Sequence, residues 1–417
     1  MNFNSSNSPE PLHSNLEHST QPMDNNNFQQ DFNPNELLQF IINAYQEARS
    51  NLGKCNLLVI GKTGVGKSTL INEVFREPIA KTGVGKPVTQ EIRKYEHSDL
   101  PLTVYDSPGL ELGAQSKEMT EAVSQLIDGK LENVDDQIHI VWYCINHNSN
   151  RLEDVEIEWL KELSNKHDVP IIIVVTQILE AEEDSKFLAD LNRQNLPVHQ
   201  IIPVLAQAKQ ITRQVTLPPY GLETLMQVTF DLLPEVAEKA FVNAIKSVDI
   251  KAKRASKYVQ GYSAGAFGIG LSPIPFSDAI PLAAEQIAML AHITAIFGIP
   301  FEDTFLTQIV SGIAGVGGAT YLGRMVVSGA LKFIPVVGTI AGGMIAGVTA
   351  AGLTKFLGLA YITALTRYMK KKISGQELSV DALEQMILKE YRDYLQSGRK
   401  DLKIYGDDEE PTVIPIS

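Results

Sequence analysis

The residues best suited to chemistry form one glycine-rich segment, Gly61-Lys62-Thr63-Gly64-Val65-Gly66-Lys67-Ser68, followed by Thr69. The segment matches G-x-x-x-x-G-K-[ST] in full. Its glycines let backbone N–H groups face phosphate oxygens, and a helix start adds partial positive charge. Lys67 would reach the β- and γ-phosphates, and the Ser68 hydroxyl would bind Mg²⁺. The segment predicts a nucleoside-triphosphate site; the alternative is a glycine-rich loop that binds no phosphate.

Two further motifs follow at suitable distances. Thr89 closes a loop 21 residues beyond Ser68. It is expected to bind Mg²⁺ and sense the γ-phosphate, unless it is an ordinary loop threonine. Asp106-Ser107-Pro108-Gly109 then gives D-x-x-G. We expect Asp106 to support Mg²⁺ through water and Gly109 to offer its N–H to the γ-phosphate.

A near copy of the first motif, residues 82–87, is not a second phosphate loop. Ala80 stands where its first glycine would be, and Pro87 replaces the metal-binding hydroxyl.

The elements around these motifs alternate between apolar strands and amphipathic helices. A buried strand is predicted over 55–60 and a helix over 67–75, so the glycine loop lies between a strand and a helix. Further strands are predicted at 102–105, 138–145, 170–175 and 201–205, and further helices at 155–163, 185–193 and 221–232. This alternation indicates an α/β fold with a doubly wound, mostly parallel sheet.

Composition divides the chain into five parts. Residues 1–35 are rich in Asn, Ser, Gln and Pro and are predicted to be a disordered leader without signal-peptide features. The nucleotide-binding domain is expected over 36–235, and a polar helix over 235–260 leads into an all-α, glycine-rich domain over 236–375. An amphipathic helix within 376–400 and a loose acidic tail over 401–417 complete the chain.

The three motifs together resemble those of the translation-factor-related (TRAFAC) P-loop GTPases, close to Era-like proteins. The glycine loop is also similar to that of septins and immunity-related GTPases. The resemblance covers about residues 50–235 and implies GTP or GDP and Mg²⁺ as ligands, with Lys67, Thr89 and Gly109 acting in catalysis. Residues 255–375 resemble an uncharacterised glycine-rich helical domain that often follows such G domains.

The base-reading motif of that family, [NT]-K-x-D, is altered here. Thr176 fits it, Gln177 replaces the lysine, Leu179 occupies the acidic position and Glu180 comes one residue late. The backbone N–H of Ala206 is expected to meet the guanine oxygen, unless Ala206 only packs at a strand end. Guanine preference therefore rests on resemblance, and ATP stays an alternative nucleotide.

The catalytic machinery also departs from the family. Leu110 stands where Ras-like enzymes place a glutamine that orients water. Slow hydrolysis is expected, with the missing group supplied by a partner or by a homodimer formed through the G domain. Arg151 is a candidate finger, but the sequence favours a solvated surface arginine at this position; Glu111 is another candidate.

Charge is unevenly distributed. The net charge is −13, yet residues 251–372 hold 11 Lys/Arg against four Asp/Glu. Uncharged stretches at 258–277, 304–323 and 333–354 approach membrane-spanning length, and basic clusters at 251–254 and 367–372 flank them. An anionic membrane is thus a candidate partner, bound peripherally or integrally at the cytoplasmic face; the alternative is a soluble helical domain packed through small residues. The acidic average argues against nucleic acid as a partner.

Two functions fit these features. The first is a slow GTP-hydrolysing switch of the cytoplasm whose helical domain docks on a membrane. The second is a nucleotide-gated scaffold that self-assembles and for which hydrolysis is incidental; Leu110 favours it.

Overall fold

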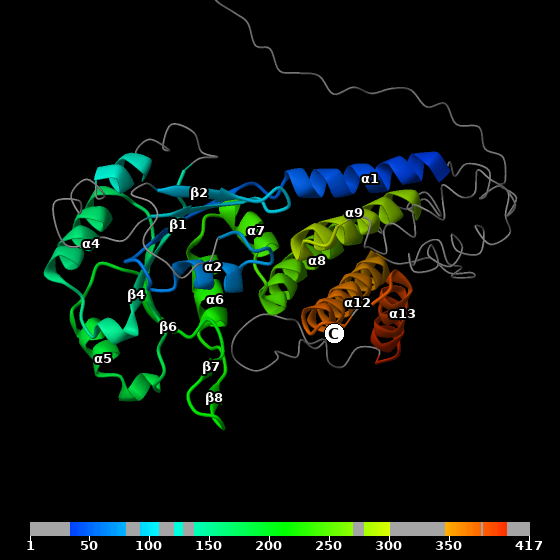
Figure 1. Cartoon of the computed structure of the whole chain (residues 1–417). Coiled ribbons are helices and arrows are strands. Elements are labelled where there is room, and N and C mark those ends of the chain that lie inside the picture. The colour runs from blue at the N-terminus through cyan, green and yellow to red at the C-terminus, as the bar shows by residue number, and fades with distance from the viewer. Residues whose placement is uncertain are drawn as a thin grey trace, which may run out of the picture.

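The computed structural model describes residues 34–80, 92–107, 121–127, 137–269, 279–300, 347–376 and 378–397. Within these ranges a six-stranded sheet with flanking helices leads into a set of long helices (Figure 1). Residues 1–33 of the predicted leader (1–35) and residues 398–417, which include the predicted acidic tail (401–417), lie outside the described residues, whereas residues 34 and 35 belong to the first helix.

The sheet has the order β2-β3-β1-β4-β5-β6, with β1 in its interior. Five strands are parallel, and β2 pairs antiparallel with β3 at one edge. The strands are β1 (Cys55–Ile60), β2 (Arg93–Glu96), β3 (Leu102–Asp106), β4 (Ile140–Asn146), β5 (Ile171–Thr176) and β6 (Gln200–Val204). The predicted doubly wound, mostly parallel sheet is confirmed.

Helices cover both faces of this sheet because its central strands are apolar on both sides. Alternate residues of β1 belong to different clusters: Leu57 and Val59 face one core, and Leu58 and Ile60 the other. The first core includes side chains of α2 (Lys67–Val74), α6 (Leu222–Leu232) and α7 (Glu235–Ala244). The second includes side chains of α4 (Asp154–Lys166), α5 (Lys186–Arg193) and the helical residues 121–127.

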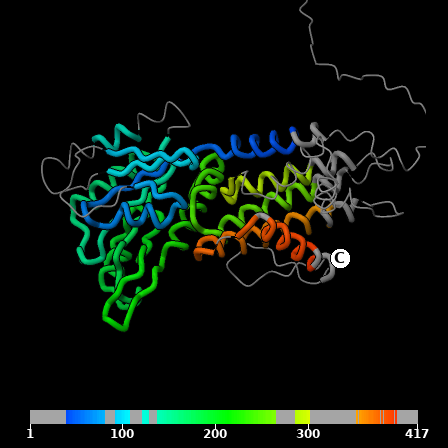
Figure 2. The backbone as a smooth tube through the Cα atoms, turned by 45° about the vertical axis from the view of Figure 1, so that its right-hand side comes forward, coloured from blue at the N-terminus to red at the C-terminus, as the bar shows by residue number. Residues whose placement is uncertain are grey.

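The long helices lie beside the sheet and pack on one another. α8 (Val248–Ile269) contacts α9 (Ala279–Phe297) and α12 (Gly347–Ile373), and α13 (Val380–Ser397) packs on α12. α1 (Pro34–Ser50) precedes the sheet in sequence but lies along α9, where Tyr45 Oη donates a hydrogen bond to Ile299 O at 3.0 Å. Figure 2 shows this group of helices extending away from the sheet. The described part of the C-terminal region is therefore helical, as the sequence predicts.

The single helix predicted over 235–260 is wrong, since the chain forms α7 and α8 with a break at residues 245–247. Ile245 leaves the helix to form an antiparallel bridge with Phe75, and Lys246 N donates to Val74 O at 2.8 Å. Ser247 Oγ then accepts from Ile250 N at 3.2 Å and caps the start of α8. A tertiary contact with the end of α2 therefore overrides local helix propensity.

Three small elements have no counterpart in the sequence prediction: β2, the helical residues 121–127, and a hairpin of β7 (Lys209–Gln210) and β8 (Thr216–Leu217). Each of these strands and helical segments has seven residues or fewer, so it gives little periodic signal. Two further short 3₁₀ turns, η3 (His147–Ser149) and η4 (Glu182–Asp184), follow β4 and β5.

The proposed membrane segments are described only in part. Residues 304–323 and most of 333–354 lie outside the described residues. None of the helices in the described part combines the length and apolarity that a bilayer crossing requires. Of the first basic cluster, Lys251 and Arg254 are buried, and Arg254 pairs with Glu238 at 2.9 Å, whereas Lys370, Lys371 and Lys372 at the end of α12 are not buried.

Candidate functional site

The glycine-rich segment leaves the carboxyl end of β1 and leads into α2, as its motif requires. Gly61 lies so close to β4 that a Cβ on it would come within 2.3 Å of Cys144 O. Gly66 adopts φ of 100° at the start of α2, a conformation that side chains disfavour. Thr63 and Gly64 are exposed at the turn of the loop, while Val65 is buried beneath it. Val65 anchors the loop in the core, and the exposed backbone at Thr63 and Gly64 is left accessible to a phosphate group.

Lys67 is the cation at the centre of the loop. It is buried, and its Nζ donates to Gly61 O at 2.6 Å and to Lys62 O at 3.4 Å. It also lies 3.8 Å from Asp106 Oδ1. The ammonium is therefore held over the loop, within reach of an anion there, while Ser68 and Thr69 follow half-buried in the first turn of α2.

Asp106 ends β3 next to the loop, where the sequence predicts an oxygen that supports a cation. Its Oδ1 is buried and accepts no hydrogen bond from the residues that the structure describes. Burial raises the pKa of this carboxyl, and the charges of Lys67 and Arg93 oppose the rise. A hard oxygen beside a hydroxyl and a phosphate cradle suits Mg²⁺. Within the described ranges no group of three or more His, Cys, Asp or Glu side chains could hold a metal ion.

Thr176 and Gln177 support the loop from the end of β5. Thr176 Oγ1 is buried and lies 2.5 Å from Val65 O and 3.1 Å from Ile145 O, so its hydrogen ties β5 to the loop and to β4. Gln177 has φ of 56°, and its Nε2 donates to Gly64 O at 3.2 Å. Both residues thus contact the phosphate loop through its backbone carbonyls.

A second loop cation, Lys62, belongs to a network that motif reasoning missed. Its Nζ pairs with Glu156 Oε2 at 3.1 Å. Glu156 is buried at the start of α4, where Oε2 also accepts from Glu153 N at 3.0 Å and Oε1 accepts from Tyr143 Oη at 2.7 Å. The network joins the loop, β4 and α4. A glutamate three residues after Glu153 was the available signal, since this spacing is typical of a capping box.

The segment after β5, where the family motif places its acidic base-reading residue, has Leu179 at that position and Glu180 next to it. Leu179 is 40% exposed, and Glu180 Oε1 lies 3.1 Å from His147 Nε2. A cavity of about 250 Å³ adjoins this segment and is lined by Leu179, Glu180, Ala181, Glu182, Leu217, Pro218 and Tyr220. Ala206 is half-buried one residue after Leu205, which pairs with Tyr220 through two backbone hydrogen bonds of 3.0 Å.

Four predicted residues lie outside the described residues: Thr89, Gly109, Leu110 and Glu111. Their assignments stay predictions. Arg151 is described after η3; its side chain is 73% exposed and its Nε pairs with Glu153 Oε1 at 2.8 Å. Among the predicted site residues that are described, the structure brings together Gly61–Thr69, Asp106, Thr176 and Gln177.

Two domain families match the chain. Residues 56–177 match the family described as 50S ribosome-binding GTPase. Residues 235–392 match a domain of unknown function, DUF697. The first match spans β1 to Gln177, and the second spans α7 to most of α13.

Septins are among the similar proteins. Neuronal-specific septin-3 of Danio rerio is 26% identical over 158 residues, which cover 32% of this chain and 44% of the septin. Septin-9 of Homo sapiens is 27% identical over 158 residues, covering 32% and 27% respectively. The match thus spans less than half the length of these relatives.

Solved structures that overlap part of the chain include a Tyr-to-Ala variant of Aquifex aeolicus Era bound to GDP.AlF4-, with 16% identity, a TM-score of 0.31 and coverage of 53% of this chain and 69% of that one. A probable GTP-binding protein engB has 18% identity, a TM-score of 0.30 and coverage of 43% and 98%. From the family matches, the chain contains the G domain of a P-loop GTPase of the TRAFAC class, a class of GTP-binding proteins, followed by a DUF697 domain.

Proposed function

We propose that this protein binds GTP with Mg²⁺, hydrolyses it slowly, and acts as a nucleotide-dependent switch. The observation that carries the proposal is the buried Lys67 held over a complete phosphate loop, 3.8 Å from the buried Asp106 oxygen. Cations and backbone N–H groups fixed before the ligand arrives cost little reorganisation when they meet phosphate charge.

Each residue of the loop has a part in this proposal. Backbone N–H groups of Gly61–Thr69 bind the phosphates, and Lys67 balances their charge. Ser68 and Asp106, with Thr89, would hold Mg²⁺, which when bound neutralises charge on the β- and γ-phosphates. Gly109 would couple loss of the γ-phosphate to a change elsewhere in the chain. With Leu110 in place of a water-orienting glutamine, turnover is expected to be slow.

The direct test of the site is Lys67→Ala. We expect it to abolish nucleotide binding because the central cation is lost, and titration with a fluorescent GTP analogue measures this. Lys54→Ala is the matched control, since Lys54 pairs with Glu96 at 3.1 Å away from the loop. Undiminished triphosphate affinity in the Lys67 variant would refute the site.

The nucleotide itself is tested by competition between GTP and ATP for the wild-type chain. Leu179 offers no acceptor for the N1 and N2 hydrogens of guanine, whereas an acidic residue at this position would accept both. Preferential displacement by GTP supports the proposal, and preferential displacement by ATP would replace GTP with ATP in it.

A nucleotide-gated scaffold is the second candidate, and Leu110 is the feature that favours it. Hydrolysis that rises with protein concentration would support an enzyme completed by a second copy of the chain, with Arg151 as a candidate contributor. Hydrolysis that stays negligible at high concentration and with anionic vesicles would support the scaffold. The lysines at the end of α12 are the surface through which a membrane would be bound, although Lys370 pairs with Asp249 at 2.8 Å.

A further inference from the structure

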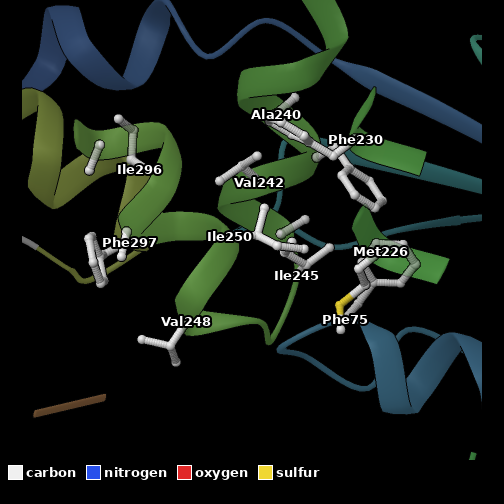
Figure 3. Close-up of a cluster of buried hydrophobic side chains, with 14 of the residues drawn as sticks. Phe75, Met226, Phe230, Ala240, Val242, Ile245, Val248, Ile250, Ile296 and Phe297 are labelled. Carbon is white, nitrogen blue, oxygen red and sulfur yellow. The ribbon is translucent and has the colours of Figure 1, made fainter. Parts of the chain in front are cut away.

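The carboxyl end of the phosphate-loop helix α2 is joined to the DUF697 domain by backbone pairing. Phe75 and Ile245 form the antiparallel bridge noted above, with Arg76 N donating to Ala244 O at 2.9 Å and Lys246 N to Val74 O at 2.8 Å. Apolar side chains surround the junction, where Phe75 lies near Met226 and Ile245 (Figure 3). The first residues after α2 therefore have fixed positions relative to the turn between α7 and α8.

A buried polar cluster extends this junction to α9. Arg76 donates from Nε to Asn243 O at 3.1 Å and from Nη2 to Asn243 Oδ1 at 3.3 Å. Asn243 Nδ2 donates in turn to Ala295 O at 2.6 Å, in the last turn of α9. Lys251, which is fully buried, donates to Asn243 O at 2.7 Å and to Ile296 O at 3.3 Å. We call Arg76, Asn243 and Lys251 the junction cluster.

The electrostatics of the cluster favour one arrangement. Carbonyls at the ends of α7 and α9 carry the partial negative charge of two helix termini, and the Arg76 guanidinium and the Lys251 amine donate hydrogen bonds to them. Burial lowers the pKa of Lys251 well below its ordinary value, and the Arg76 charge adds to the effect. Asn243 and the fully buried Lys251 meet the carbonyls at the end of α9 only when α7, α8 and α9 keep their places. The half-buried Arg76, which also donates to Asp99 O at 2.6 Å, connects Asn243 to the end of α2. Loss of Asn243 therefore removes the side-chain link between α2 and α9.

We propose that Asn243 and Lys251 of the DUF697 domain are positioning residues for the nucleotide site, acting through Arg76 and α2. This inference rests on the proposed function of the loop. α2 has eight residues and is about 12 Å long, with Lys67 and Ser68 at one end and Arg76 just beyond the other. A short helix moves as a unit, so its orientation at the junction cluster sets the position of its phosphate-facing end. Both GDP and GTP would meet this end, so the DUF697 domain is coupled to nucleotide occupancy rather than to the γ-phosphate alone.

Hydrogen exchange of the full chain without nucleotide tests the positioning. Asn243→Ala should raise amide exchange across residues 67–76 at least about fivefold, within the usual range of coupling between sites. Gln286→Ala is the matched control, because it also removes a buried amide, one that donates to Thr354 Oγ1 at 2.9 Å between α9 and α12. Equal exchange across 67–76 in the two variants would overturn the inference.

Nucleotide affinity gives the second readout. Asn243→Ala should weaken GDP and a non-hydrolysable GTP analogue by the same factor of about five or more, whereas Gln286→Ala should weaken neither. A loss of affinity confined to the GTP analogue, or no loss of affinity for either nucleotide, would overturn the inference.

A second variant and the wild-type affinity separate failure of this inference from failure to fold and from failure of the proposed function. Should Asn243→Ala fail to fold, Arg76→Met replaces it, with the exposed Arg193→Met as its control, because the Arg193 side chain is 77% exposed. Should the wild-type chain bind neither nucleotide, the proposed function fails, while the exchange comparison still decides the positioning.

Discussion

At the scale of single residues, the phosphate loop depends on side chains that lie far from it in sequence. Thr176 reaches Val65 O, Gln177 reaches Gly64 O, and Glu156 holds Lys62. These contacts come from β5 and α4, whose ends meet the loop at the carboxyl edge of the sheet. Ligands of open α/β sheets bind at this edge, and the supports of the loop gather there for the same reason.

Thr176→Val should weaken nucleotide binding by about tenfold, which corresponds to about 1.4 kcal/mol and to the loss of one buried hydrogen bond. Valine keeps the shape of threonine but cannot donate to Val65 O, so the loop loses its support. Titration with a fluorescent GDP analogue measures the change. Thr229→Val is the control, since Thr229 Oγ1 accepts from Trp142 Nε1 at 3.0 Å on α6, and it should leave affinity unaltered. Equal affinity in both variants would contradict a bracing role.

At the scale of elements, the helical region is built on close contact between α8 and α12. Gly358 on α12 faces α8, where an added Cβ would lie 2.5 Å from Val259 Cγ2 and 3.0 Å from Met289 Sδ on α9. Gly352, on the same helix, has no atom of the described residues within 4 Å of such a Cβ. The two glycines therefore have different roles, which composition alone cannot separate.

Gly358→Ala should destabilise the protein by about 1–3 kcal/mol, because the extra methyl group forces packed helices apart. Gly352→Ala should stabilise it by roughly 0.5–1 kcal/mol, because alanine loses less conformational entropy in a helix. Chemical unfolding followed by circular dichroism measures both. A loss of stability in the Gly352 variant equal to that in the Gly358 variant would show that the α8–α12 contact is not the cause.

At the scale of the whole molecule, one apolar core extends from the sheet into the helices. It includes Val59 and Trp142 of the sheet, Phe241 of α7, and Leu357 and Tyr361 of α12. α7 also packs on β1 and β3, so its side chains belong to the covering of the sheet. The domain boundary predicted between residues 235 and 236 marks a change in the sequence pattern. The shared core contains side chains from both sides of this boundary.

Because the core is shared, the G domain and the DUF697 domain should unfold together. Differential scanning calorimetry of the whole chain is expected to give one transition whose calorimetric and van't Hoff enthalpies agree. Two resolved transitions would contradict a common cooperative unit. Repeating the scan with Asn243→Ala then shows whether the junction cluster maintains the cooperativity.

The sequence could predict whatever is encoded locally. The strand–loop–helix from Cys55 to Val74 follows from an apolar run and a phosphate-loop motif, and α13 follows from helical periodicity. The phosphate-facing residues are likewise adjacent in sequence, which is why the candidate site could be named from Gly61 to Ser68 before its geometry was known. Apolar runs that alternate with helical patterns also predicted the parallel sheet, because parallel strands need crossover connections that are usually helices.

Only the tertiary structure decided what these elements are attached to. The helix expected over 235–260 is interrupted at Ile245, because the backbone of Ile245 pairs with that of Phe75. This pairing satisfies backbone groups through a tertiary contact, which local helix propensity does not include. The tertiary structure also placed Lys251 inside the protein, where carbonyls at the ends of two helices accept its hydrogens. From sequence, a lysine in a basic run is predicted to be an exposed surface charge. The sequence shows only its neighbours along the chain, whereas its burial depends on its neighbours in space.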